Sequence, residues 1–184
     1  MLISGDIESM PFVEALRQLQ LKLHRDEFCL IHISMVPIVG ADGEQKTKPT
    51  QHSVKELRAL GLVPDFIVCR AKNELERGSR EKISLFCNVP PERVLSMPDL
   101  SNIYHVPLIL IQQSFHKLLV EKLNLNYIEG IEYESIENNN YYKEWNDLAV
   151  GIDSTTDTAT IAVVGKVRSI IYLVYNDINM LLYQ

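Results

Sequence analysis

The sequence has few cysteines and lacks long apolar runs. Its three cysteines, Cys29, Cys69 and Cys87, show no CxxC spacing, and an odd number does not form a disulfide framework. No apolar run reaches the roughly 20 residues that a membrane-spanning helix needs. The first residues also lack the charged, apolar and small-residue order of a signal peptide. We therefore expect a cytosolic protein with buried, reduced thiols.

The sequence also lacks an excess of positive charge. It has 18 Lys and Arg residues against 24 Asp and Glu residues, which gives a net charge of −6. Broad nucleic-acid and membrane surfaces need a basic excess, so we expect neither partner. The five histidines show no metal-ligand spacing such as HExxH. We predict no metal site among them, and no Ser/His/Asp or paired-carboxylate pattern identifies a catalytic residue.

Glycine-rich phosphate loops are absent as well, since neither GxxxxGK[ST] nor GxGxxG occurs. What the chain does contain is an alternation of apolar strands and amphipathic helices. Strands are predicted at residues 28–39, 66–69 and 94–97, and helices at residues 10–23, 49–60, 77–87 and 107–123. This alternation predicts an α/β fold with a mostly parallel sheet that is covered by helices on both faces.

The last third of the chain has a different composition. Residues 126–157 are rich in Asn, Glu and Tyr without a clear period, and we interpret them as a linker with a short helix near residues 144–150. Residues 158–165 predict a new strand. The stretch from 168 to 184 is compatible with either strand or helix.

Two lysines stand directly before a predicted helix. Lys46 and Lys48 precede Pro49, a residue that favours the first turn of a helix. A helix start exposes unpaired N–H groups and the positive end of a dipole, and Thr50 and Gln51 add donors in the first turn. The pattern fits either a solvated charged loop or a pocket for a di- or triphosphate.

Other polar residues lie where ligands bind in parallel sheets. Arg70 and Asp99, like the lysine loop, follow the carboxyl ends of predicted strands, which meet at one sheet edge. Lys82 is either a surface lysine paired with a carboxylate or a ligand group. Asp6 and Glu8 either cap the first helix or contact a ribose or a magnesium-bound phosphate.

Five segments together closely resemble the amidoligase (synthetase) domain of CTP synthase. They are residues 5–12, 43–57, 64–70, 81–89 and 101–107, and the string KTKPTQ at residues 46–51 is the most specific of them. The resemblance covers residues 5 to about 125. It continues more weakly to residues 161–166, which look like the opening strand of that family's glutaminase domain.

The resemblance implies a P-loop NTPase-like (dethiobiotin synthetase-like) α/β fold, truncated at its N-terminus. It implies a partial synthetase domain at residues 1–125, a linker at 126–157, and the first strand and divergent remnant of a glutaminase-like domain at 158–184. It also implies a ligase of pyrimidine nucleotide biosynthesis that aminates UTP to CTP with ATP, Mg²⁺ and glutamine or ammonia. The implied partners are UTP, CTP, ATP and further copies of the chain, because the family forms tetramers.

By the same resemblance, specific residues would hold the nucleotides. UTP or CTP would contact Asp6, Ile7, Glu8, Lys46, Thr47, Lys48, Pro49, Thr50, Gln51 and Lys82, and ATP would contact Arg70, Asp99 and Leu100. The family's phosphate loop, magnesium carboxylates and glutaminase residues have no counterpart in this sequence. We therefore expect the 184-residue chain to be inactive alone. The alternatives are a non-catalytic UTP- or CTP-binding or oligomerisation module, or a truncated gene product.

Overall fold

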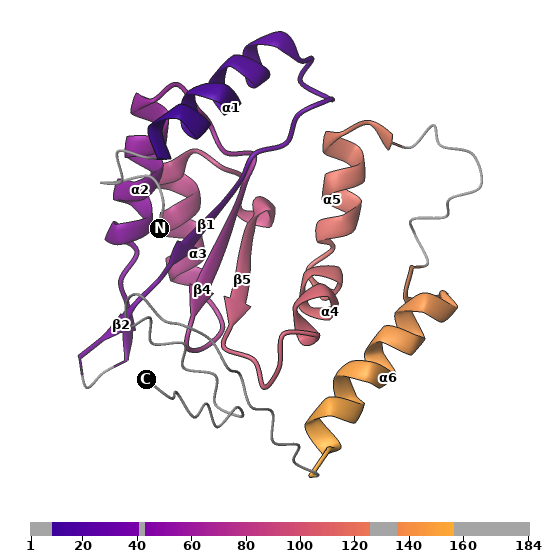
Figure 1. The fold of residues 1–184 in the computed structure, drawn as a ribbon. Coiled ribbons are helices and arrows are strands. Elements are labelled where there is room, and N and C mark those ends of the chain that lie inside the picture. Colours follow the sequence, from indigo (N-terminus) through magenta and orange to yellow (C-terminus); the bar gives the residue numbers. More distant parts are fainter. Residues whose placement is uncertain (1–8, 41–42, 126–135, 157–184) are drawn as a thin grey trace, which may run out of the picture. The chain divides into compact units, whose positions relative to one another are not determined.

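The sheet at the centre of the molecule has three parallel strands. The computed structural model describes residues 9–40, 43–125 and 136–156 (Figure 1). In it, β1 (Ile31–Met35), β4 (Phe66–Ala71) and β5 (Val94–Pro98) pair in the order β1-β4-β5. Phe66 of β4 lies opposite Ile31 of β1, and Ile67 lies opposite Val94 of β5. The predicted α/β fold with a parallel sheet is confirmed.

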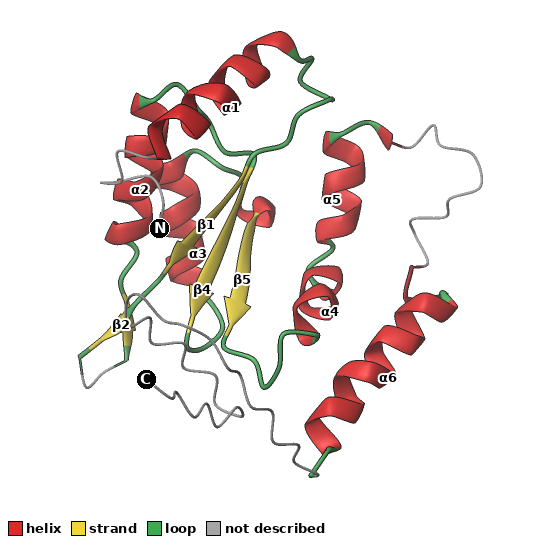
Figure 2. Cartoon of the chain, in the orientation of Figure 1, coloured by secondary structure: helices red, strands yellow, loops and turns green. Residues whose placement is uncertain are grey.

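Helices cover both faces of this sheet (Figure 2). The helices of the described residues are α1 (Met10–Lys22), α2 (Lys48–Ala59), α3 (Arg77–Cys87), α4 (His105–Gln112), α5 (Phe115–Lys122) and α6 (Asn140–Ser154). α2 and α3 pack on one face and α4 and α5 on the other. α1 contacts the end of α2 through Val13 and Leu57. None of the described helices is both long enough and apolar enough to cross a membrane.

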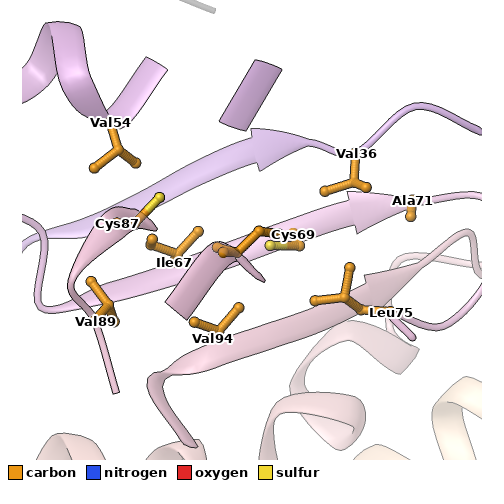
Figure 3. Close-up of a cluster of buried hydrophobic side chains, with 10 residues drawn as sticks. Val36, Val54, Ile67, Cys69, Ala71, Leu75, Cys87, Val89 and Val94 are labelled. Carbon is orange, nitrogen blue, oxygen red and sulfur yellow. The ribbon is translucent and has the colours of Figure 1, made fainter. Parts of the chain in front are cut away.

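The alternation of side chains along β4 divides the core into two layers. Ile67 and Cys69 point toward α2 and α3, where they meet Val54 and Cys87 (Figure 3). Phe66 points to the opposite face. Burial raises the pKa of Cys69 to about 12 and that of Cys87 to about 11. These two thiols are buried as predicted, whereas Cys29 is only half-buried.

The strand predicted over residues 28–39 is interrupted. β1 ends at Met35, and the N–H of Val36 donates to Arg70 O at 2.7 Å. The chain then folds back, so that β2 (Ile38–Val39) pairs in antiparallel fashion with β3 (Glu44–Gln45). The turn uses Gly40 and Gly43, whose φ values of 86° and 69° favour glycine. The segment between the predicted strand at residues 28–39 and the predicted helix at 49–60 therefore contains one strand of a short hairpin.

The helix predicted over residues 107–123 is also interrupted. It forms two helices, because Ser114 adopts a left-handed conformation with φ of 58°. α6 is longer than the helix predicted at residues 144–150 and lies within the predicted linker, so the domain boundaries stay a prediction. The predicted strand at 158–165 and the stretch 168–184 lie outside the described residues. The described elements belong to the compact unit Met1–Asp153, except for the last residue of α6.

Candidate functional site

The start of α2 presents backbone donors beside two lysines. Thr47 is the N-cap residue, Lys48 is the first helical residue and Pro49 follows it. The N–H groups at the start of a helix have no acceptor within the helix, and Pro49 has no N–H group. The hairpin positions Lys46 just before the helix, because the N–H of Lys46 donates to Pro37 O at 2.9 Å. Lys46 and Lys48 thus flank the positive end of the helix dipole.

A carboxylate of the hairpin pairs with the first of these lysines. Lys46 Nζ lies 2.5 Å from Glu44 Oε2. The hydrogen bond and the charge of Lys46, with a smaller contribution from the charge of Lys82, hold the pKa of the Glu44 carboxyl below its ordinary value. A polyanion bound here would take over the position of that carboxylate beside the lysines.

A buried glutamine fixes the spacing between the lysine loop and α3. Gln45 donates through Nε2 to Glu74 O at 2.7 Å, and its Oε1 accepts from the N–H of Glu76 at 2.9 Å. Glu76 is the N-cap residue of α3, the helix that carries Lys82. The hairpin strand β3 is thereby tied to the start of α3. Sequence reasoning missed this role, because Gln45 precedes the lysines as an ordinary polar loop residue.

Thr50 and Gln51, which were predicted as donors, have side chains that are already engaged. Thr50 is fully buried, and its Oγ1 lies 3.0 Å from Ser34 Oγ of β1. Gln51 Nε2 donates to Thr47 Oγ1 at 3.0 Å. The Thr50 hydroxyl therefore anchors α2 on the sheet, and only its backbone N–H can serve an anion at the helix start. The predicted contacts of Thr50 and Gln51 with the nucleotide stay a prediction.

A hollow of about 430 Å³ continues along the outer face of α2. It is lined by Lys48, Gln51, His52, Lys55 and Arg58 of α2 and by Phe86 of α3. Arg58 is held in place by a hydrogen bond to Cys87 O. The spacing of three and four residues between these polar side chains indicates a basic face of the helix. The sequence analysis considered only the residues of the first turn.

A second cavity, of about 720 Å³, opens at the carboxyl ends of β4 and β5. Arg70, Asp99 and Leu100 all line it, so the structure brings together the three residues predicted to contact ATP. Its other walls are largely apolar and come from β1, β4, β5 and α4, among them Val68 and Met97. The N–H of Asp99 donates to Ala71 O at 3.0 Å and holds the rim on β4. An apolar cavity with a few polar groups at its edge suits a planar base.

Three further predicted residues lie outside the residues that the structure describes. Asp6, Ile7 and Glu8 fall in the segment that precedes residue 9, so their role stays a prediction. Among residues 9–40, 43–125 and 136–156, no group of three or more His, Cys, Asp or Glu side chains could hold a metal ion. We derive no step through a metal.

Comparisons with known proteins agree on one family. The family model described as "CTP synthase N-terminus" matches residues 3–125. CTP synthase 1 of Homo sapiens is 48% identical over 162 residues, which are 88% of this chain and 26% of that protein. CTP synthase of Dictyostelium discoideum is 46% identical over 168 residues, 88% of this chain and 30% of that protein. The chain thus spans less than a third of the length of these relatives.

Proposed function

The chain belongs to the CTP synthase family, and we propose that it serves the ATP-dependent amination of UTP to CTP by holding the nucleotides. The parallel α/β sheet and the family match support this proposal. The observation that carries it is the placement of Lys46 and Lys48 at the start of α2. Such a placement favours a ligand with several adjacent negative charges, and the triphosphate of UTP or CTP has that character.

Binding of the triphosphate would replace the carboxylate of Glu44 beside Lys46 with phosphate oxygens. Lys46 pairs with Glu44 across an exposed surface, where ion pairs contribute little. A triphosphate offers Lys46, Lys48 and Lys82 several oxygens at once, together with the N–H groups of the first turn of α2. We therefore expect the phosphates to displace Glu44 from Lys46. Gln51, bonded to Thr47, would stiffen this turn and add a donor.

The second nucleotide would occupy the cavity at the carboxyl ends of β4 and β5. Its apolar walls would accept the adenine ring of ATP, and Arg70 and Asp99 would supply a cation and an acceptor at the rim. In the reaction that we propose, ATP phosphorylates the uracil O4, and ammonia, supplied as such or from glutamine, displaces the phosphate. The described residues contribute by holding both nucleotides in place, which is a large part of catalysis in phosphoryl transfer.

Calorimetry with UTP and CTP tests the triphosphate site. The double variant Lys46→Ala/Lys48→Ala should bind either nucleotide at least tenfold more weakly than the original chain, because each hydrogen bond from a charged donor contributes about 1.5–3 kcal/mol. The matched control is Lys117→Ala, which removes an exposed lysine from α5 and should leave both affinities unchanged.

Two results would contradict the proposal. One is equal affinity of the double variant and the original chain for UTP, with both folded by circular dichroism. The other is a loss of affinity in Lys117→Ala as large as that in the double variant, which would indicate non-specific charge attraction rather than a site at α2.

A further inference from the structure

A carboxylate on α6 gathers three polar side chains from the segment before and at the start of α4. Asp153 Oδ2 accepts a hydrogen bond from Ser101 Oγ at 3.0 Å, and Oδ1 accepts from Asn102 Nδ2 at 2.6 Å. His105 Nε2 lies 2.6 Å from Oδ2. Ser101, Asn102 and His105 lie far from Asp153 in the sequence. The cluster therefore forms only because α6 packs against the segment that contains them.

Other contacts fix α6 against the same segment independently of Asp153. The indole N–H of Trp145 donates to Tyr104 O at 2.8 Å, and the two rings lie 5.7 Å apart. Asn102 Nδ2 also donates to Ala149 O at 3.1 Å, and Ala149 is fully buried. α6 therefore packs on residues 101–105 along about two turns, with Asp153 at its carboxyl-terminal end.

The segment that Asp153 holds is also the rim of the larger cavity. Ser101 and Asn102 line that cavity together with Asp99 and Leu100. Asn102 is bonded on two sides, because its Nδ2 donates to α6 and its Oδ1 accepts from the N–H of Tyr104, the N-cap residue of α4, at 3.0 Å. A change in the position of Asn102 would therefore move both the rim and the start of α4.

We propose that Asp153 is a positioning residue for an adenine nucleotide in this cavity, which it serves by fixing Ser101 and Asn102 without contacting the ligand. The identity of the ligand rests on the proposed function, while the positioning role rests on the contacts of Asp153. Hydrogen bonds from His105, Ser101 and Asn102 hold the pKa of the Asp153 carboxyl below its ordinary value. The side chain is thus a charged acceptor at neutral pH, and charged acceptors form the stronger bonds.

The test compares two ligands on one set of variants. In Asp153→Asn and Asp153→Ala, the affinity for a non-hydrolysable ATP analogue should fall on the order of tenfold, whereas the affinity for UTP should stay unchanged. Asp153→Glu should recover part of the loss, because it keeps the charge. The control Asp147→Asn removes an exposed carboxylate from the same helix and should change neither affinity.

A measurement without ligand separates the positioning role from the ligand assignment. The side-chain NH₂ signals of Asn102 in ¹H–¹⁵N spectra should shift in Asp153→Asn, and the amides of residues 101–105 should exchange faster with solvent. Unchanged Asn102 signals would overturn the inference. Shifted signals with unchanged affinity for the ATP analogue would overturn it as well. An original chain that binds UTP but no ATP analogue would instead contradict the proposed function of the cavity.

Discussion

At the scale of single residues, the side of the helix on which a residue lies decides whether its side chain is available to a ligand. Lys48 and Thr50 stand two positions apart on α2, and Lys48 is exposed whereas Thr50 is fully buried against Ser34 of β1. Both are polar and both follow the lysine loop, so composition alone cannot separate them. Burial assigns the lysine to the surface and the threonine to the attachment of the helix to the sheet.

The buried imidazole of His32 on β1 makes stability depend on pH. Its Nε2 lies 3.0 Å from Ser53 Oγ of α2, and burial lowers the pKa of this imidazole below its ordinary value of 6.5. As the pH falls below 6.5, the unfolded chain therefore takes up this proton at a higher pH than the folded chain does. The free energy of unfolding should therefore decrease as the pH falls below 6.5, by at most about 1.4 kcal/mol per pH unit.

Urea unfolding at pH 7.5, 6.5 and 5.5 measures this dependence. His32→Gln should be less stable at pH 7.5 and should show a flatter decrease over the same range. The exposed control His24→Gln should keep the slope of the original chain. A slope that is unchanged in His32→Gln would mean that other groups account for the pH dependence.

At the scale of elements, a glutamine side chain contacts the sheet at the point where one predicted helix becomes two. Gln113 Oε1 accepts from the N–H of Ser96 at 2.8 Å, and Gln113 Nε2 donates to Ser96 O at 2.7 Å. Ser96 belongs to β5, which is an edge strand of the described sheet. The amide thus pairs with backbone groups that a further strand would otherwise satisfy. The helix break at Ser114 accompanies this contact.

Substitution of Gln113 should therefore cost more than that of its neighbour. Gln113→Leu leaves the partly buried N–H and C=O of Ser96 unpaired and should lower the free energy of unfolding by about 1–3 kcal/mol. Gln112→Leu changes an exposed residue and should stay within about 0.5 kcal/mol. Urea titration of both variants decides the point, and equal stabilities would show that Gln113 does not stabilise the edge of β5.

At the scale of the whole molecule, one helix presents an apolar stripe to solvent. Phe12, Leu16 and Leu19 of α1 follow one another at helical spacing and are 73%, 39% and 43% exposed. Such a stripe favours association with another protein surface. We therefore expect two copies of the chain to associate through this stripe.

Light scattering coupled to size-exclusion chromatography tests this association. The original chain should elute as a dimer or larger species at micromolar concentration. Phe12→Ser/Leu19→Ser should reduce its mass to that of a monomer, because it removes most of the stripe. Gln18→Ser, an exposed polar position on the same helix, should not change the mass. A monomeric original chain at all concentrations would contradict the proposal.

The sequence by itself determined the alternation of elements, the parallel sheet and the lysine loop at the start of α2. These follow from apolar periodicity and from residue preferences at helix starts, which are local properties. Tertiary structure alone decided that Gln45 connects β3 to the start of α3, and that Asp153 holds the rim of the cavity lined by Arg70, Asp99 and Leu100. It also decided the breaks at Val36 and Ser114. Each of these depends on hydrogen bonds, packing or charges between residues far apart in the chain, and local patterns carry no information about such pairs. The lysine string thus indicated an anion site, and the fold supplied the hairpin that holds Lys46 beside the start of α2.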